Sequence, residues 1–246
     1  MLRIAFLEGS PSLRARHVLP ILTKQFKITY ITSGDDIPQG TYEDVIRFPK
    51  AKVDMQHAWA YSRLADRLYQ EGKIDFVYTY HAIGCFIRKA PQIALFGASF
   101  LESWKLSFHW TPWYKRPKLA IGYLHYVVPE IMTCRQAKRI LAISEALQLQ
   151  FIELHRLPKN KVGIVHNGVT QEAFNNFAGE AIGKSTDLLY VGRLHPRKGI
   201  LPIVEEFSRR RHMQNKFYLA GDGPLSNEIK RIAEKDKRIV LLGHLK

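Results

Sequence analysis

Short apolar runs alternate with longer amphipathic segments along most of this chain of 246 residues. This alternation limits the possible folds more than any other feature, because a buried strand followed by a covering helix is the repeating unit of parallel α/β sheets. Strands are expected at residues 2–7, 28–32, 76–80, 93–96, 138–144 and 162–165, and helices at 15–26, 55–70 and 145–155. The pattern predicts a doubly wound, Rossmann-like α/β domain over residues 1–174.

Residues 175–186 interrupt the alternation with a small, polar stretch that we expect to be a linker between domains. Within it, residues 179–186 resemble a phosphate-binding P-loop, but three residues instead of four separate the glycines, so we expect no P-loop function. The alternation restarts, with strands expected at 187–191, 217–220 and 239–242 and helices at 199–211 and 224–235. Roughly 60 residues bury too little surface for an independent α/β domain. Residues 187–246 are therefore expected to be the first half, β-α-β-α-β, of a second Rossmann-like domain, and the chain to be truncated within it.

The charge balance is strongly basic, with 37 Lys and Arg against 22 Asp and Glu, a net charge of +15 and a pI near 9.8. Residues 84–140 carry nine basic and two acidic side chains, and residues 181–246 carry fourteen and seven. Such regions favour anionic partners, among them nucleic acid, acidic lipid headgroups and phosphorylated small molecules. The alternative is that both regions are ordinary solvated faces.

The cysteine content is low, since Cys85 and Cys134 are the only two and no Cys/His cluster has zinc spacing. Neither a disulfide framework nor a metal site is expected. No stretch approaches the ~20 apolar residues of a membrane span, and the apolar run at residues 2–7 is too short for a signal peptide. These observations favour a cytoplasmic protein that is at most peripheral to a membrane.

A basic loop lies between the expected strand at 187–191 and the helix that follows it. Gly192 allows the chain to turn, and Arg193, Arg197 and Lys198 gather before the helix begins. Cations beside a helix N-terminus suit a diphosphate group. The competing interpretation is a basic surface loop. A second strand–turn–helix follows at residues 219–225, where Gly221 and Gly223 allow close backbone approach, although a Gly-x-Gly alone is a weak signal.

Together these two turns resemble the donor-binding domain of group 1 glycosyltransferases, glycosyltransferase family 4, which have the GT-B fold. The matching motifs are V-G-R-L-x-x-x-K-G at 191–199, A-G-D-G-P-L at 220–225 and the strand ending in Leu242-Gly243. Upstream, Ile143-Ser144-Glu145, residues 161–169 and Arg16-His17-Val18-Leu19 also resemble the family. The resemblance is specific over 141–243 and diffuse before it.

The resemblance implies a retaining, metal-independent transfer of a sugar from a nucleoside diphosphate sugar, with no resident cofactor. Arg193 and Lys198 would neutralise the diphosphate and stabilise the charge that grows on it as the sugar leaves. The other donor-binding residues expected from the resemblance are Gly9, Ser10, Gly192, Gly221, Asp222, Gly223, Leu225 and Leu242. No Asp-x-Asp sequence occurs, which agrees with a transfer that needs no metal bridge.

Two departures from the family pattern concern the expected catalytic residues. The family has a Glu-x7-Glu segment beyond the last strand seen here, and the chain ends before that position. A histidine often follows the strand corresponding to 93–96, where this chain has Gly97. His81, directly after the strand at 76–80, is our candidate for a catalytic histidine, and the alternative is a structural role.

Aromatic and basic residues interleave over residues 103–126, with Trp113 and Tyr114 beside Lys115 and Arg116. This combination suits a membrane interface, single-stranded nucleic acid, or an ordinary core. Because the N-terminal domain of the family receives the acceptor, often lipid-linked, we expect peripheral contact with an anionic membrane, at the inner face of the cell membrane.

The sequence as a whole predicts a glycosyltransferase acting on a nucleotide sugar and a glycan or lipid-linked acceptor, as in polysaccharide biosynthesis. One alternative is a non-catalytic, truncated remnant of such an enzyme. The other is a basic nucleic-acid-binding protein, for which no recognition motif is present. Nucleic acid is the least expected partner.

Overall fold

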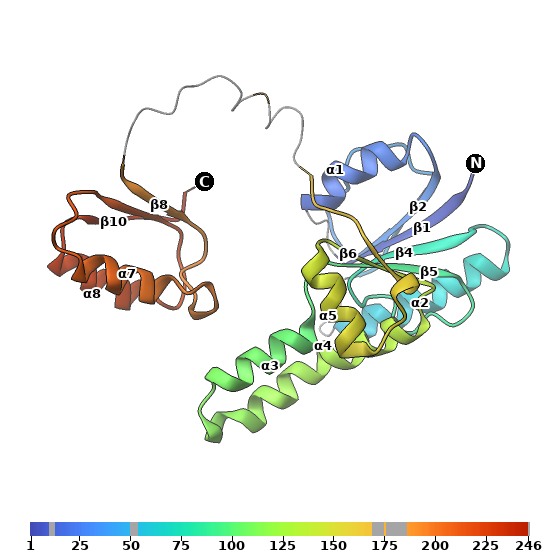
Figure 1. Ribbon diagram of the computed structural model, residues 1–246. Helices are drawn as coiled ribbons and strands as arrows, with labels where there is room; N and C mark the ends of the chain where they lie inside the picture. The colour runs from blue at the N-terminus through green and yellow to red at the C-terminus, as the bar shows by residue number, and fades with distance from the viewer. Residues whose placement is uncertain (10–12, 50–53, 169–174, 176–185, 246) are drawn as a thin grey trace. The chain divides into compact units, whose positions relative to one another are not determined.

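The computed structural model describes residues 1–9, 13–49, 54–168, 175 and 186–245 (Figure 1). The chain divides into two compact units, unit 1 (Met1–Phe174) and unit 2 (Asn175–Lys246). Most of the expected linker, including its P-loop-like stretch, lies outside the described residues. Each unit has its own buried core, so each is described by itself.

Unit 1 is built on a seven-stranded sheet in which every neighbouring pair is parallel. The strands are β1 (Arg3–Glu8), β2 (Lys27–Thr32), β3 (Asp44–Arg47), β4 (Phe76–Tyr80), β5 (Gln92–Phe96), β6 (Arg139–Ala142) and β7 (Val162–Ile164). Their order is β3-β2-β1-β4-β5-β6-β7, so the direction of winding reverses between β1 and β4. In such sheets ligands bind at the carboxyl ends of the strands where this reversal occurs.

Helices cover both faces of this sheet because the buried side chains of each strand alternate between the faces. The helices are α1 (Leu13–Leu22), α2 (Asp54–Gln70), α3 (Phe100–Trp110), α4 (Arg116–Gln136) and α5 (Glu145–His155). In β1, Leu7 packs with Tyr61 of α2, whereas Phe6 packs with Leu19 of α1 on the opposite face. The doubly wound α/β class predicted for this region is confirmed.

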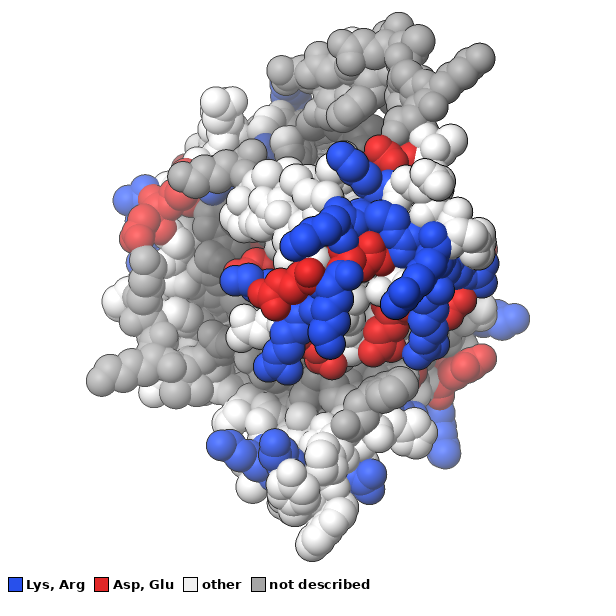
Figure 2. Space-filling model, turned by 90° about the vertical axis from the view of Figure 1, so that its left-hand side faces the viewer, with Lys and Arg blue, Asp and Glu red and all other residues white. Residues whose placement is uncertain are grey.

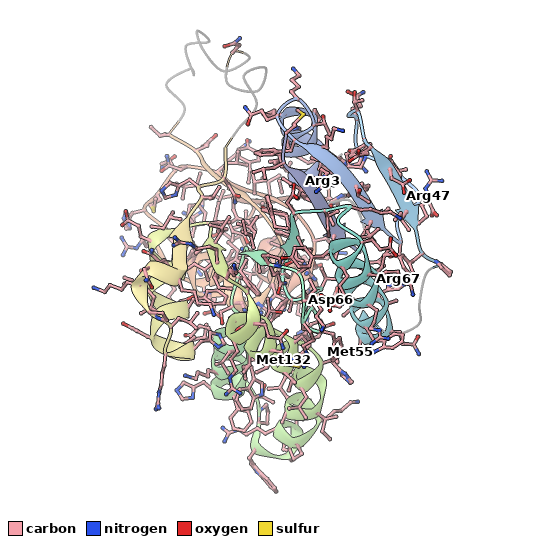
Figure 3. All side chains as sticks on the ribbon, turned by 90° about the vertical axis from the view of Figure 1, so that its right-hand side faces the viewer. Arg3, Arg47, Met55, Asp66, Arg67 and Met132 are labelled. Atoms are coloured by element: carbon pink, nitrogen blue, oxygen red, sulfur yellow. The ribbon has the colours of Figure 1, made fainter. Side chains whose placement is uncertain are left out.

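Two polar contacts at the amino ends of the strands, opposite the ligand-binding edge, fix how the strands enter the sheet. Asp66 of α2 accepts hydrogen bonds from the backbone N–H groups of Arg88, Lys89 and Ala90, the segment that leads into β5 (Figure 3). At the start of β1, Arg3 pairs with Asp75, just before β4, at 2.8 Å. Both contacts hold the paths of β4 and β5 beside β1.

The structure differs from the sequence expectation at several elements. The helical hairpin of α3 and α4 was not predicted. Its interleaved aromatic and basic residues do not show the three- and four-residue spacing of apolar side chains that marks a core helix. Edge strand β3 was also missed, since only Val45 and Ile46 of its four residues are apolar. Helix α1 ends at Leu22, four residues earlier than predicted. Phe26 follows the apolar spacing of the helix because it packs on the same core cluster from the turn after α1. Strand β6 is shorter than predicted because Ser144 leaves the sheet to cap α5, accepting from Leu147 N–H.

Unit 2 contains a parallel three-stranded sheet in the order β10-β9-β8, with α7 and α8 packed on it. Its elements are β8 (Leu188–Val191), α7 (Ile200–Arg209), β9 (Phe217–Ala220), α8 (Ser226–Lys235) and β10 (Ile239–Gly243). The predicted β-α-β-α-β order is observed, with both helices beginning slightly later than expected. Val204, Phe207 and Ile229 bury the apolar faces of the two helices against the sheet.

Basic and acidic side chains mix on the face shown in Figure 2. Within unit 2, Glu206 pairs with Arg209 and Arg210, and Asp236 pairs with Arg238 at 2.6 Å. These ion pairs offset part of the basic charge of unit 2.

Candidate functional site

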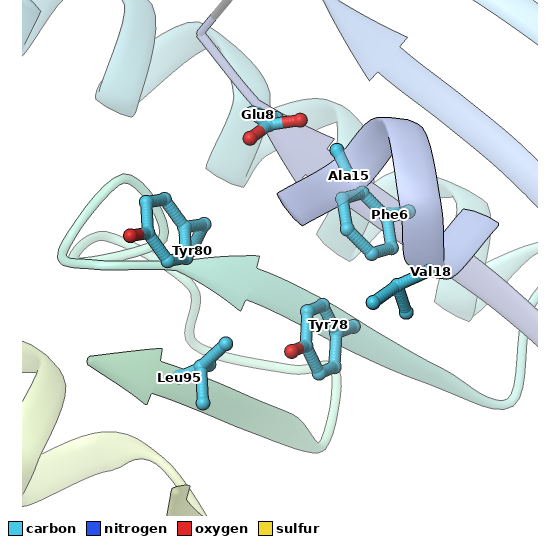
Figure 4. A pocket seen from close by; sticks show the side chains of 7 residues that line it. All are labelled: Phe6, Glu8, Ala15, Val18, Tyr78, Tyr80 and Leu95. Carbon is cyan, nitrogen blue, oxygen red and sulfur yellow. The ribbon is translucent and has the colours of Figure 1, made fainter. Parts of the chain in front are cut away.

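A pocket lies where the winding of the seven-stranded sheet reverses (Figure 4). Strand β1 contributes Phe6 and Glu8, β4 contributes Tyr78 and Tyr80, and α1 covers one side. The cavity itself is small, about 10 Å³, which leaves room for about one water molecule.

Glu8 is the last residue of the central strand β1 and is 3% exposed. The Tyr30 hydroxyl donates to its Oε2 at 3.3 Å. Burial and the Glu8 charge both raise the pKa of Tyr30, and the same two causes raise the pKa of Tyr42 to about 12. The sequence analysis did not single out Glu8. A carboxylate directly after a buried apolar strand could have marked it as a candidate site residue.

His81 directly follows β4 at the same edge of the sheet and has a φ of 56°. A left-handed backbone is uncommon for a residue other than glycine and is over-represented at functional sites. Its Nδ1 is buried and has no hydrogen-bond partner among the residues that the structure describes. Burial lowers the pKa of His81, against the smaller raising effect of the Glu130 charge. His81 is therefore a neutral imidazole at neutral pH.

The imidazole of His81 lies next to Gly97, which follows the adjacent strand β5. A Cβ at Gly97 would lie 3.9 Å from His81 Nε2 and 3.1 Å from the Tyr80 hydroxyl. The left-handed turn thus brings the His81 ring beside the position where the family often has a histidine. The rings of Phe96 and Phe100 contact His81 at 5.8 and 5.3 Å between centroids, which holds the imidazole at this edge.

Gly9 continues β1 at this edge, and its carbonyl accepts from Ser33 N–H at 3.1 Å. A Cβ at Gly9 would only touch Ile83, at 3.6 Å, so the position tolerates a side chain sterically. Ser10, the second residue expected to contact a ligand here, lies outside the described residues.

A buried carboxyl group in α4 bonds to groups at the start of α3 and at the end of α5. Glu130 is fully buried and accepts from Ser99 Oγ at 2.9 Å and from Phe100 N–H at 2.5 Å, at the start of α3. The His155 Nε2, at the end of α5, lies 2.8 Å from Glu130 Oε1. Glu130 therefore joins three helices behind His81. Sequence reasoning missed it because α4 was not predicted as a helix.

In unit 2, the basic loop leaves β8 and ends at the N-terminus of α7. A short 3-10 turn at Pro196–Lys198 precedes Gly199, whose φ of 65° starts the helix. The side chain of His195 accepts from Arg197 N–H at 3.2 Å, and the Tyr190 hydroxyl donates to Arg193 O at 2.9 Å. The side chains of Arg193 and Lys198 are exposed. The loop thus presents cations from an ordered backbone.

The loop after β9 packs directly against this basic loop through its glycines. A Cβ at Gly221 would lie 1.9 Å from Gly192 O, and one at Gly223 would lie 2.4 Å from Leu194 O. Gly192 N–H donates to Ala220 O at 2.9 Å, and Leu194 N–H donates to Asp222 O at 3.0 Å. The absence of side chains on Gly221 and Gly223 is therefore required for the two loops to meet.

The remaining predicted donor-binding residues differ in exposure. Leu225 is buried in the core of unit 2, whereas Leu242 on β10 is exposed. Two hydrogen bonds lower the pKa of the Asp222 carboxyl group. The larger effect comes from the Ser226 side chain and the smaller from Gly223 N–H. Asp222 thus fixes the start of α8. The structure brings together the predicted residues of 192–225 in unit 2 and, separately, Gly9 and His81 in unit 1.

The described part of the chain has neither a metal-binding cluster nor a membrane-spanning helix. It contains no group of three or more His, Cys, Asp or Glu side chains arranged to hold a metal ion. None of its helices combines the length and apolar character needed to span a membrane.

The family model for glycosyltransferase family 4 matches residues 16–173, which is more than half of the chain and falls within unit 1. The chain belongs to glycosyltransferase family 4. The family predicted from the motifs is therefore confirmed, and the chain is a glycosyltransferase. No curated protein sequence matches this chain.

Solved glycosyltransferases share this family 4 fold at low sequence identity. WaaB, a lipopolysaccharide outer core galactosyltransferase, is 14% identical with a TM-score of 0.63, over 100% of this chain and 69% of WaaB. WaaG, a glycosyltransferase involved in lipopolysaccharide biosynthesis, is 18% identical with a TM-score of 0.60, over 99% of this chain and 70% of WaaG. HepE from Anabaena, solved with UDP-glucose, is 14% identical with a TM-score of 0.59, over 100% of this chain and 70% of HepE. The GT-B fold class is confirmed.

Proposed function

We propose that this family 4 member transfers a sugar from a nucleoside diphosphate sugar to a glycan or lipid-linked acceptor, with retention of configuration and without a metal ion. The observation that carries the proposal is the basic loop of unit 2. Lys198 lies directly before the N-terminus of α7, where backbone N–H groups also favour an anion, and Arg193 lies earlier in the same loop. HepE, which has the same fold, was solved with UDP-glucose.

The chemistry of the basic loop follows from where charge develops during transfer. When the bond between the sugar and the diphosphate breaks, the electron pair stays on the phosphate oxygen and negative charge grows there. Positive groups held at that oxygen stabilise the transition state more than the ground state. Arg193 and Lys198 supply this charge themselves, which supports a transfer that needs no metal bridge. Retention is proposed from the family resemblance.

His81 is our proposed catalytic residue in unit 1. Its neutral imidazole lies at the carboxyl edge of the sheet, where ligands of doubly wound sheets bind. Because Nδ1 is buried, Nε2, on the side of Gly97, is the nitrogen that we propose to hydrogen-bond with the sugar undergoing transfer. The strained backbone at His81 is consistent with a position set by function.

The donor proposal is tested by UDP-glucose binding, measured by calorimetry, and by transfer from UDP-sugars to a lipid extract. Arg193→Ala and Lys198→Ala should each lower the transfer rate by about 100-fold or more, the usual loss for one charge-stabilising group. Arg211→Ala, which removes an exposed cation just beyond α7, is the matched control and should be near wild type. Near-normal transfer in both loop variants would refute the assigned role. Donor binding without turnover would favour the non-catalytic alternative.

We also propose that the helical hairpin of α3 and α4 contacts an anionic membrane surface. The hairpin projects from unit 1, and the short turn Trp113–Lys115 joins its two helices (Figure 1). Trp113 and Tyr114 are 78% and 63% exposed, and Lys115 and Arg116 adjoin them. In contrast, Trp104 and Phe108 are half-buried and the Ser107 and Tyr123 hydroxyls bond across the hairpin at 3.1 Å, so part of the aromatic content is core.

The membrane proposal is tested by flotation with vesicles of phosphatidylglycerol and phosphatidylcholine. The wild type should float with anionic vesicles at low salt and less at high salt, because surface charge is screened. Replacing Trp113 and Tyr114 together by serine should release the protein. Trp59→Ser, which removes another exposed tryptophan from α2, is the control and should float normally. A wild type that stays with the unbound fraction at low salt would exclude this contact.

A further inference from the structure

The buried carboxyl group of Glu130 lies where α3, α4 and α5 meet (Figure 1). Moving a carboxylate from water into a protein interior costs free energy, and well-packed apolar side chains often give a structure equal or greater stability. Apolar packing could therefore join the three helices without a carboxyl group. The groups that Glu130 binds indicate what the carboxyl group adds.

Glu130 holds the turn between β5 and α3, residues 97–100. Its carboxylate accepts from Ser99 Oγ at 2.9 Å and from Phe100 N–H at 2.5 Å. Ser99 is also the N-cap of α3, since its Oγ accepts from Glu102 N–H at 3.2 Å. The first N–H groups of a helix have no partner within it, so an acceptor from outside decides where they lie. Glu130 therefore fixes, from α4, the path of the chain from the end of β5 into α3.

The turn that Glu130 holds packs directly on the His81 ring. The Phe100 ring lies 5.3 Å from the His81 ring between centroids, and a Cβ at Gly97 would lie 3.9 Å from His81 Nε2. Tyr126 stacks on the Phe100 ring at 5.2 Å. Tyr126 and Glu130 are four residues apart on α4, so both lie on the same face of that helix. One face of α4 thus holds both the backbone and the ring of Phe100 beside His81.

Glu130 also acts on His81 through its charge. Burial lowers the pKa of His81, and the Glu130 charge raises it by a smaller amount. Two other titratable groups lie close by: the Tyr80 phenol, whose ring contacts His81 at 4.3 Å, and His155, whose Nε2 lies 2.8 Å from Glu130 Oε1. The side chains that β5 and α3 pack on His81 are aromatic and carry no charge. Among the described residues, Glu130 is therefore the charged group that acts on the imidazole.

We propose that Glu130 is a positioning residue for His81, because by holding residues 97–100 it fixes the imidazole at the carboxyl edge of the sheet. The inference rests on the proposed function, in which His81 hydrogen-bonds with the sugar undergoing transfer. Glu130 is fully buried, so it does not contact the sugar and acts through the turn. Since donor binding is assigned to the basic loop of unit 2, loss of Glu130 should lower turnover without weakening donor binding.

The first test removes the charge of Glu130 and keeps its volume. In Glu130→Gln the pKa of His81, measured by NMR of the imidazole in the whole chain and assigned with His81→Asn, should fall below the wild-type value. The kcat for transfer should fall about tenfold or more with the KM for UDP-glucose unchanged, because one donor of the turn loses its acceptor and the imidazole shifts. Glu153→Gln makes the same change at an exposed position of α5 and should alter neither. An unchanged or raised pKa of His81 in Glu130→Gln would overturn the proposal, as would a normal kcat.

A second variant, Phe100→Leu, covers the case in which Glu130→Gln does not fold. It removes the ring beside His81 and leaves the Glu130 carboxyl group and its backbone hydrogen bond in place. Because burial lowers the pKa of His81, uncovering the imidazole should raise this pKa toward 6.5. Phe108→Leu, the same change further along α3, is the control and should leave the pKa unchanged. A wild-type pKa of His81 in Phe100→Leu would also overturn the proposal.

The NMR measurement separates this inference from the proposed function, because it needs no turnover. A wild type that transfers no sugar would count against the proposed function, and the pKa of His81 in the variants would still decide the role of Glu130. Conversely, normal transfer by Glu130→Gln with an unchanged pKa of His81 would count against Glu130 alone.

Discussion

A single methyl group has no room at Gly221, where the loops after β8 and β9 meet. A Cβ there would lie 1.9 Å from Gly192 O, and the φ of 144° is unfavourable for any other residue. We predict that Gly221→Ala lowers the free energy of unfolding of unit 2 by more than about 2 kcal/mol, because both strain and overlap must be relieved by moving backbone. Urea denaturation followed by fluorescence would measure the change.

Gly122→Ala is the matched control for this substitution. Gly122 lies within α4, and nothing lies within 4 Å of the position that its Cβ would occupy. The same change should leave stability unaltered or raise it by up to about 1 kcal/mol, because alanine favours a helix. Equal effects at Gly122 and Gly221 would contradict the close packing of the two loops.

The lowered pKa of His81 predicts a pH dependence of stability. In the unfolded chain the imidazole titrates near 6.5, whereas burial disfavours its protonation in the folded chain. Below pH 6.5 the unfolded chain therefore binds more protons, so stability falls with pH until the lowered folded pKa is reached. His81→Asn should lose less stability than the wild type between pH 7 and pH 5. Parallel stability curves for the two proteins would show that His81 is not the group responsible.

At the scale of elements, Glu130 joins α3, α4 and α5. Removing a fully buried carboxyl group leaves Ser99, Phe100 N–H and His155 without their acceptor. We expect Glu130→Ala to cost about 3–5 kcal/mol of unfolding free energy. Glu130→Gln keeps one acceptor oxygen and the volume, so it should cost clearly less. Chemical denaturation of both variants tests this, and a loss below about 1 kcal/mol in the alanine variant would show that the three helices are held mainly by apolar packing.

At the scale of the whole molecule, the division into two units with separate cores predicts two unfolding transitions in calorimetry. A ligand that binds one unit stabilises that unit by mass action. UDP-glucose at about 100 times its Kd should therefore stabilise one transition by about 2.7 kcal/mol. Arg193→Ala should abolish that shift if the stabilised transition belongs to unit 2. A single cooperative transition would contradict independent units.

How well each element could be predicted depended on how completely it is buried. Strands β1, β4 and β9 are continuous apolar runs, and α2, α7 and α8 carry clear apolar faces, so their positions followed from periodicity. Edge strand β3 is half-exposed and shows no such run. The α3–α4 hairpin exposes apolar residues such as Trp113 and Ile121 to solvent, so its pattern departs from that of a core helix.

The sequence by itself determined the α/β class, the family and the cationic loop at Arg193 and Lys198, because these depend on local residue order and on spacing along the chain. Only the tertiary structure decided which residues meet at the sheet edge. Glu8, His81 and Gly97 are far apart in the sequence, and the order of β1, β4 and β5 places them at neighbouring strand ends. Strand order arises from packing between distant segments. The pocket that Glu8 and Tyr80 share therefore follows from the folded sheet and not from any motif.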